Sequence, residues 1–217
     1  VLDGDEFVVH GQKLFSSRAQ HAEYAWMVVR TDPNVPKHKG ISLLIVDMKS
    51  PGITIGYYKT MSGWLHPTVY FDSVRVPRSS LVSELNRGWY HVMAALDFER
   101  ASIGNPGQVL RQYDILLKYC KETYQNGHPL INDPRVGSLL AKLAAEVRAC
   151  RSMAYWVASI HARGEYPQHE TSLAALFKRE TVRSIQTAHL SLLGAWGQLR
   201  PHSPSAPLDG KVEHAYL

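Results

Sequence analysis

The chain has 217 residues, of which 45% are hydrophobic and 20% charged, an ordinary composition for a folded globular protein. This excludes a disordered, collagen-like or disulfide-scaffold protein. The net charge of +5 is spread along the sequence without a basic cluster, so nucleic acid is not an expected partner. No apolar run approaches the ~20 residues of a membrane span and no signal peptide opens the chain, so we expect no membrane contact.

Residues 1–80 carry the pattern of short β-strands. A turn signal at Asp3-Gly4 separates the first apolar pair from a second apolar segment at 7–9. Runs rich in β-branched and aromatic residues follow at 23–30, 41–48, 53–59 and 68–76, with turn-forming residues between them. Short strands at this spacing predict an antiparallel sheet or barrel rather than alternating βαβ units.

The second half changes to a helical period. Apolar residues recur at helical intervals from Trp89 to Leu117, and Pro106 is expected to kink or divide that helix. Asp133 and Pro134 predict a new helix, with Asp as N-cap and Pro at the first helical position. A third helix is expected from about residue 170 to Gly194.

These patterns define a predicted fold and its domains. The proline-rich tail at 200–216 is predicted to be a loop. Long amphipathic helices joined by short loops favour a bundle. We therefore expect an α+β fold, with an antiparallel β-barrel-like domain at 1–83 followed by an incomplete α-helical bundle domain at 84–217.

Glu99 interrupts the apolar stripe of the first helix. Val92, Leu96, Glu99 and Ile103 are spaced by four, three and four residues, so a face that buries the apolar three would also turn Glu99 inward. A desolvated carboxylate is suited to taking a proton from carbon. The alternative is that Glu99 pairs with a nearby arginine or lies at the edge of the stripe.

A second candidate segment runs from Lys13 to Arg18, at the end of a predicted strand. There Phe15 is followed by the hydroxyl residues Ser16 and Ser17. An exposed ring beside two hydroxyls offers a face and hydrogen-bond donors to a planar ligand. The alternative is an ordinary strand end with a serine turn.

Neither the cysteines nor the histidines form a metal-ligand pattern. Cys120 and Cys150 stand in helical patterns and are predicted to be reduced thiols of a cytoplasmic protein. The eleven histidines are scattered along the chain, and we expect surface or core packing for them. Four of them are expected in loops: His21, His38, His66 and His128.

Several segments, taken in order, resemble the acyl-CoA dehydrogenase family. Those segments are Gly11-Gln12-Lys13-Leu14-Phe15-Ser16-Ser17, residues 30–33 and 39–47, Val69-Tyr70-Phe71-Asp72-Ser73-Val74-Arg75-Val76-Pro77, Asn86-Arg87-Gly88-Trp89, and Leu192-Leu193-Gly194-Ala195-Trp196-Gly197. The resemblance runs collinearly over essentially the whole chain. It implies the middle β-domain and part of the C-terminal helical domain of that family. The family's N-terminal helical domain and its last cofactor-binding segment are then expected to lie outside these residues.

The resemblance also implies a reaction, the α,β-dehydrogenation of an acyl-CoA thioester. In one branch of the family the base that removes the α-proton stands in a pattern like L-D-x-E-R, which matches residues 96–100. Glu99 then resembles the base, Arg100 the adjacent pocket arginine and Asp97 a contact to the pantetheine arm, with Phe98 beside them in the substrate site. Phe15, Ser16 and Ser17 resemble the residues that contact the flavin of FAD, with Phe15 in place of a tryptophan.

The implied partners are an acyl-CoA substrate, electron-transfer flavoprotein as electron acceptor, and further copies or related chains in a dimer or tetramer. Residues 126–136 depart from the common cofactor-binding helix pattern and, with the tail, resemble bacterial members that act on bulky acyl-CoAs, including steroid side chains. Two other functions remain open. One is a non-catalytic or site-sharing subunit of a hetero-oligomer, and the other is an acyl-CoA oxidase or flavin monooxygenase of the same fold.

Overall fold

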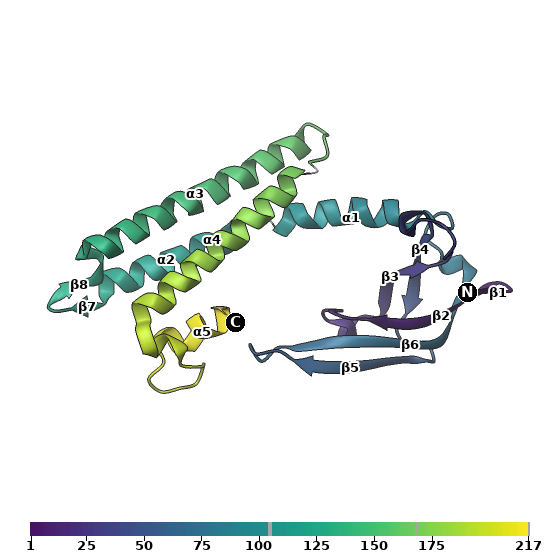
Figure 1. The fold of residues 1–217 in the computed structure, drawn as a ribbon, viewed down its shortest axis with the longest axis horizontal. Coiled ribbons are helices and arrows are strands. Elements are labelled where there is room, and N and C mark those ends of the chain that lie inside the picture. The colour runs from purple at the N-terminus through teal and green to yellow at the C-terminus, as the bar shows by residue number, and fades with distance from the viewer. Residues whose placement is uncertain (104–105, 168, 217) are drawn as a thin grey trace. The chain divides into compact units, whose positions relative to one another are not determined.

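The computed structural model describes residues 1–103, 106–167 and 169–216, except for the side chains of residues 97, 98 and 100–103. The chain divides into two compact units, Val1–Leu96 and Asp97–Leu217, and the division falls inside a helix. The first contains most of the β-strands, and the second contains most of the α-helices together with a short β-hairpin (Figure 1).

The first unit is built from antiparallel strands. The strands are β1 (Leu2–Asp3), β2 (Glu6–Lys13), β3 (Tyr24–Arg30), β4 (Ile41–Asp47), β5 (Ile53–Lys59) and β6 (Leu65–Pro77). One sheet has the order β1-β2-β6-β5, and β3 pairs with β4 in a second sheet. Short 3-10 helices lie between them at Ala19–His21, Lys37–Lys39 and Arg78–Ser80. The predicted β-pattern and its antiparallel pairing are confirmed, with both sheets open.

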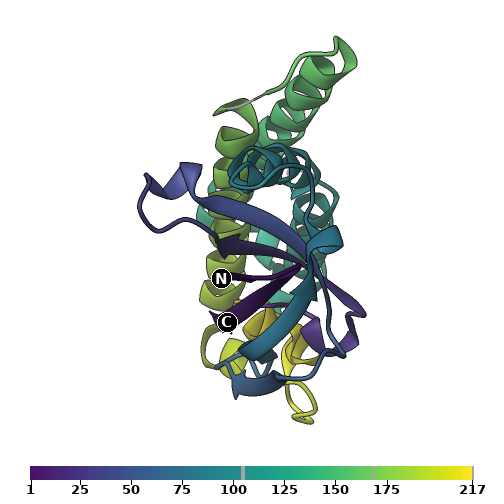
Figure 2. The same cartoon turned by 90° about the vertical axis from the view of Figure 1, so that its right-hand side faces the viewer.

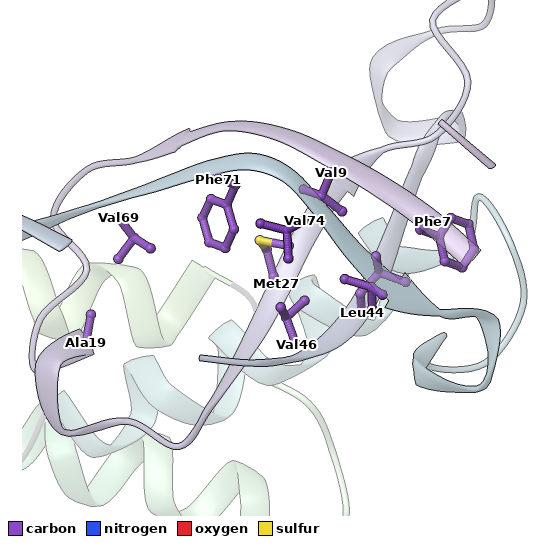
Figure 3. Packing of buried hydrophobic residues seen from close by; sticks show 10 residues of the cluster. Phe7, Val9, Ala19, Met27, Leu44, Val46, Val69, Phe71 and Val74 are labelled. Carbon is purple, nitrogen blue, oxygen red and sulfur yellow. The ribbon is translucent and has the colours of Figure 1, made fainter. Parts of the chain in front are cut away.

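Alternating apolar residues of the two sheets form one core. Met27 and Val46 come from the second sheet, and Phe71 and Val74 from β6 of the first (Figure 3). Leu44 and Val46 are fully buried. Burying such side chains contributes about 1.5–3 kcal/mol each, so this core holds the two sheets together.

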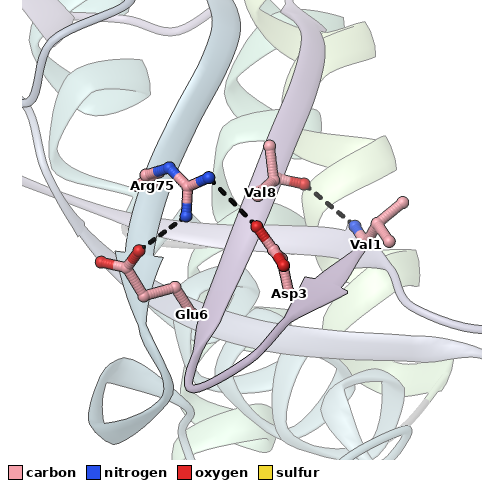
Figure 4. A network of polar contacts seen from close by, with 5 residues as sticks. All are labelled: Val1, Asp3, Glu6, Val8 and Arg75. Carbon is pink, nitrogen blue, oxygen red and sulfur yellow. Dashed lines mark hydrogen bonds and ion pairs between the residues drawn. The ribbon is translucent and has the colours of Figure 1, made fainter.

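A glycine turn connects β1 to β2, and ion pairs join this first hairpin to β6. Gly4 has φ +62°, which a residue without Cβ adopts freely, and it joins β1 to β2. On β6, Arg75 donates to Asp3 at 3.0 Å and to Glu6 at 2.9 Å (Figure 4). Both ion pairs lie at the surface, so they fix the register more than they add stability.

The second half is helical. The helices are α1 (Gly88–Ile103), α2 (Gly107–Glu122), α3 (Pro134–Ala162), α4 (His169–Leu193) and α5 (Lys211–Tyr216). A two-stranded hairpin of β7 (Tyr124–Gln125) and β8 (His128–Pro129) follows α2, and further 3-10 helices lie at Leu130–Asn132, Gly194–Gln198 and Pro207–Gly210. Pro106 separates α1 from α2, as its missing N–H predicts.

Three helices share a second core. Val109 and Leu116 of α2, Leu143 of α3 and Ile185 of α4 are almost completely buried. Helices α3 and α4 lie side by side (Figures 1 and 2). The side chain of Asp133 accepts a hydrogen bond from Arg135 N–H, so the predicted N-cap of α3 is confirmed.

Three local predictions are wrong. His128 lies on β8 and not in a loop. The tail is not a loop throughout, because the 3-10 helix Pro207–Gly210 and α5 occupy its end. His66 lies on β6 and not in a loop, since the strand begins at Leu65 and runs through Pro67. The ring nitrogen of Pro67 cannot donate to a neighbouring strand, but its carbonyl accepts from Ser16 N–H at 3.3 Å.

In the part of the chain that the structure describes, no helix is long and apolar enough to cross a membrane. Among the same residues no group of His, Cys, Asp or Glu side chains is placed to hold a metal ion. Cys120 and Cys150 are free and buried in helices.

Candidate functional site

The segment after β2 presents an aromatic ring on an unusual backbone. β2 ends at Lys13, and Phe15 has φ +55°, which is costly for a bulky residue, about 1–3 kcal/mol. Its side chain is 72% exposed. A strained backbone that holds an apolar ring in solvent is typical of a binding site rather than of a packing residue.

Two further rings surround Phe15. Tyr58 of β5 and His66 of β6 are cross-strand partners, and their rings stack with centroids 5.5 Å apart. Phe15 meets both edge-on, at 6.1 Å from Tyr58 and 6.3 Å from His66. Such edge-to-face contacts fix a ring's orientation, so the three side chains form an aromatic platform.

The sequence reasoning missed Tyr58 and His66 as members of this site. The signal was present in the pairing of the two strands, because a hairpin of residues 53–59 with a strand beginning before Pro67 places residues 58 and 66 opposite each other. The sequence pattern places the start of that second strand at Thr68, and this leaves His66 outside the predicted strand and unpaired with Tyr58.

The serines complete the segment. Ser16 donates through its N–H to the carbonyl of Pro67 and through Oγ to the carbonyl of Lys13 at 3.4 Å. Ser17 is exposed. A groove of about 420 Å³, within the range of ligand pockets, runs beside them and is lined by both serines, Trp26 and Met27 among others.

Lys13, the last residue of β2, also lines this groove. Its ammonium donates to the carbonyl of Val28 on β3 at 2.7 Å, and burial lowers its pKa. An exposed ring, an apolar groove and accessible hydroxyls together fit a planar heteroaromatic group, whose faces are apolar and whose edge accepts hydrogen bonds. The residues present at 15–17 therefore fit a flavin ring.

The second candidate segment lies on α1. Residues 97–100 belong to the continuous helix Gly88–Ile103, while the side chains of Asp97, Phe98 and Arg100 lie outside the described residues. Glu99 is exposed, and Val92 and Leu96 of the same stripe are only half-buried. The expectation that this chain turns Glu99 into a buried face is therefore wrong.

The reason is that an apolar stripe is buried only where another element covers it. In the described part of α1 only Gly88 is buried. Glu99 is thus an exposed carboxylate on a helix whose apolar neighbours Val92 and Leu96 are half-buried.

The comparison with protein families is decisive. Residues 1–74 match the model for the middle domain of acyl-CoA dehydrogenase, and residues 86–216 match the model for its C-terminal domain. This chain belongs to the acyl-CoA dehydrogenase family. The resemblance read from the sequence is therefore confirmed, with its α+β fold.

Individual members of the family agree with this assignment. Acyl-CoA dehydrogenase FadE26 of Mycobacterium tuberculosis is 33% identical over 228 residues, which cover 100% of this chain and 56% of that protein. The solved Tcur3481-Tcur3483 steroid ACAD has a TM-score of 0.90 at 33% identity, covering 99% of this chain and 55% of that one.

A third similar structure is the ChsE4-ChsE5 complex from Mycobacterium tuberculosis, with a TM-score of 0.89 at 32% identity, covering 99% of this chain and 56% of that one. The chain spans about half the length of the relatives that it matches.

Proposed function

We propose that this chain forms part of an FAD-dependent enzyme that dehydrogenates an acyl-CoA thioester between its α and β carbons. The observation that carries the proposal is the match to both family domains, with Glu99 in an L-D-x-E-R segment on α1. When bound, FAD supplies the acceptor for the β-hydride. The residues of this chain bind the ring and remove the α-proton.

Glu99 is the proposed base. The carboxylate takes the α-proton as the Cα–H bond breaks, while hydrogen bonds to the thioester carbonyl stabilise the developing enolate. Its exposure in this chain gives the substrate access to the carboxylate. A carboxylate becomes a more effective base toward carbon when the bound substrate excludes water from it, so we expect the acyl chain to cover Glu99.

The remaining residues of the L-D-x-E-R segment are proposed to hold the substrate. Asp97 is proposed to contact the pantetheine arm of the substrate, and Phe98 and Arg100 to line the pocket that holds the acyl chain. They stand on the same helix within one turn of Glu99, so a thioester held by them lies within reach of its carboxylate.

Phe15, Ser16 and Ser17 are the proposed flavin contacts. Phe15 presents its exposed ring, and the stacked Tyr58 and His66 hold that ring in place. Ser17 offers its hydroxyl to the ring edge. Ser16 already donates to Lys13 and Pro67, so its role is to fix the turn.

The proposed electron acceptor is electron-transfer flavoprotein, as the family resemblance implies. The proposed substrate is a bulky acyl-CoA. The similar Tcur3481-Tcur3483 protein is named a steroid enzyme, and the departure of residues 126–136 from the common pattern supports the same class.

The test is Glu99→Gln in the purified, FAD-loaded protein. Removing a general base slows the reaction by about 10²–10⁴-fold, so reduction of the flavin by acyl-CoA should slow by that factor while the flavin spectrum stays unchanged. Glu84→Gln is the matched control, since Glu84 is another exposed glutamate. Full activity in Glu99→Gln would remove Glu99 as the base.

A second candidate function is a subunit that shares its site with a related chain. The ChsE4-ChsE5 complex and the Tcur3481-Tcur3483 protein each carry the names of two chains. In that case the purified chain stays colourless when FAD is added and becomes a flavoprotein only with its partner. Retention of FAD by the chain alone favours the first function.

A further inference from the structure

A groove with basic walls runs along one edge of β3, within the first unit. It has a volume of about 480 Å³, and the residues that line it are Lys13, Val28, Val29, Arg30, Pro33, Lys37 and Ile41. Among the residues that the structure describes, β3 pairs with β4 alone, so its other edge is open. Val28 and Val29 belong to opposite faces of the strand, and since both line the groove, it follows this open edge.

The backbone of β3 presents hydrogen-bond donors along the same edge. The N–H of Thr31 donates to the carbonyl of Gly40 at 2.9 Å, so residue 31 faces the β4 side of the hairpin. Alternation then turns Val28 and Arg30 to the open edge. The carbonyl of Val28 confirms this, because it accepts from Nζ of Lys13 on β2 at 2.7 Å. The N–H groups of Val28 and Arg30 therefore point to the groove side of the strand.

Three cationic side chains line the groove, and its lining residues include no Asp or Glu. Nζ of Lys13 lies at the edge of β3, where burial lowers its pKa because water is lost and no carboxylate replaces it. The guanidinium of Arg30 donates to the carbonyl of Val35 at 2.7 Å, which holds it beside the loop after β3. Lys37 is exposed in that loop.

The acidic residues nearest in the hairpin are directed elsewhere. Oδ1 of Asp32 accepts the N–H of Asn34 at 2.9 Å, within the turn of the loop itself. Asp47 is paired with Tyr24 at the other end of the two strands, about 20 Å from Arg30 at the rise of an extended chain. The groove therefore carries a positive charge that no lining carboxylate neutralises.

The groove also has an apolar part. Val28, Val29 and Ile41 line it and are each half-buried. A free phosphate ion would fill only a small share of about 480 Å³ and would leave these side chains in contact with water. The shape and the lining therefore favour a ligand that joins an anionic group to a compact apolar body.

We propose that this groove binds a phosphate monoester, with the phosphate held by Lys13, Arg30 and Lys37 and the organic body against Val28 and Ile41. Arginine, lysine and backbone N–H groups are the donors that proteins commonly use for phosphate. The inference goes beyond the proposed dehydrogenase activity and does not depend on it.

The test compares three probes by calorimetric titration of the full chain. 2-Naphthyl phosphate carries both the anion and the apolar body, 2-naphthol carries only the body, and inorganic phosphate carries only the anion. We expect 2-naphthyl phosphate to bind at least about tenfold more tightly than either of the others, because each lacks one of the two sets of contacts. Equal affinity of 2-naphthol, or of inorganic phosphate, would overturn the proposal.

A pair of matched variants locates the site. Lys37→Gln removes one exposed cation of the groove, and it should weaken 2-naphthyl phosphate about tenfold, as expected for one charge-assisted hydrogen bond. Lys49→Gln removes an exposed lysine beyond the far end of β4 and should leave the affinity unchanged.

The two variants carry the same change in net charge, so general attraction of an anion to a basic protein affects both equally. Equal weakening by Lys37→Gln and Lys49→Gln, or no weakening by Lys37→Gln, would show that the groove is not the binding site and would overturn the proposal. Because both side chains are exposed, neither variant is expected to disturb folding.

Discussion

Gly88, the first residue of α1, lies directly against the backbone of Ser42 on β4. A Cβ at position 88 would stand 2.6 Å from the carbonyl carbon of Ser42. The contact is reinforced by side chains, since Thr31 Oγ1 and the N–H of Asn86 both meet Ser42 Oγ at 2.7 Å. The strand that carries Ser42 therefore fixes the start of the helix that carries Glu99.

Gly88→Ala should destabilise the first unit because backbone atoms cannot move away from the added methyl group. Overpacking of this kind costs about 1–3 kcal/mol in the free energy of unfolding, which urea denaturation measures. Gly137→Ala in α3 is the control. Its Cβ would meet only Ile131 O at 3.8 Å, and alanine favours a helix, so stability should stay equal or rise. A neutral Gly88→Ala would contradict the described contact.

Phe15→Gly should separate stability from flavin binding. Glycine adopts φ +55° without strain, so the free energy of unfolding should stay equal or rise. Loss of the ring should weaken FAD by up to about tenfold, as expected for one aromatic contact. Ser73→Gly, also at φ 55°, should relieve strain without changing FAD affinity. Fluorescence titration with FAD measures the affinity, and an unchanged value in Phe15→Gly would exclude the aromatic contact.

Stability should fall as the solution becomes acidic, partly through His189. Burial lowers its pKa below the ordinary 6.5, whereas the unfolded chain regains that value. Below pH 6.5 the unfolded state therefore binds a proton at His189 that the folded state does not bind. The free energy of unfolding then declines through this group by at most about 1.4 kcal/mol per pH unit. His189→Phe should show a smaller decline between pH 7 and 5 in urea denaturation. Equal slopes would mean that His189 is not held neutral.

The cysteines should be unreactive in the folded chain. Cys120 is fully buried, Cys150 lies 3.3 Å from Thr181 Oγ1, and burial raises the pKa of both thiols. Because the thiolate is the reactive form, a thiol reagent at pH 8 should label the folded chain about 100-fold more slowly than the chain in 6 M guanidinium chloride, as expected when labelling requires local opening. Rapid labelling of two thiols in the folded chain would contradict the described burial.

The sequence predicts the local elements well because their signals are local. Alternation and turn residues define the strands, Asp133 and Pro134 define the start of α3, and Pro106 separates two helices. The tail is different. Gly210 has φ +69° and packs against Arg200 and Pro201, after which six residues without proline form α5. A prediction based on the proline content of the tail therefore misses α5.

The candidate site is predicted less well because it depends on tertiary contacts. The aromatic platform requires the pairing of Tyr58 with His66, and the burial of Glu99 requires a covering element that periodicity does not reveal. Phe15 is found by its residue type and position at a strand end. Its left-handed backbone and exposure are visible only in the structure.

The most direct measurement is the visible absorption spectrum of the purified, FAD-loaded protein before and after addition of acyl-CoAs, from short straight chains to bulky cyclic ones. The account predicts a bound flavin whose absorption near 450 nm bleaches with at least one acyl-CoA, preferably a bulky one, and bleaches far more slowly in Glu99→Gln. A flavin that binds and stays oxidised with every acyl-CoA would contradict the proposed dehydrogenation.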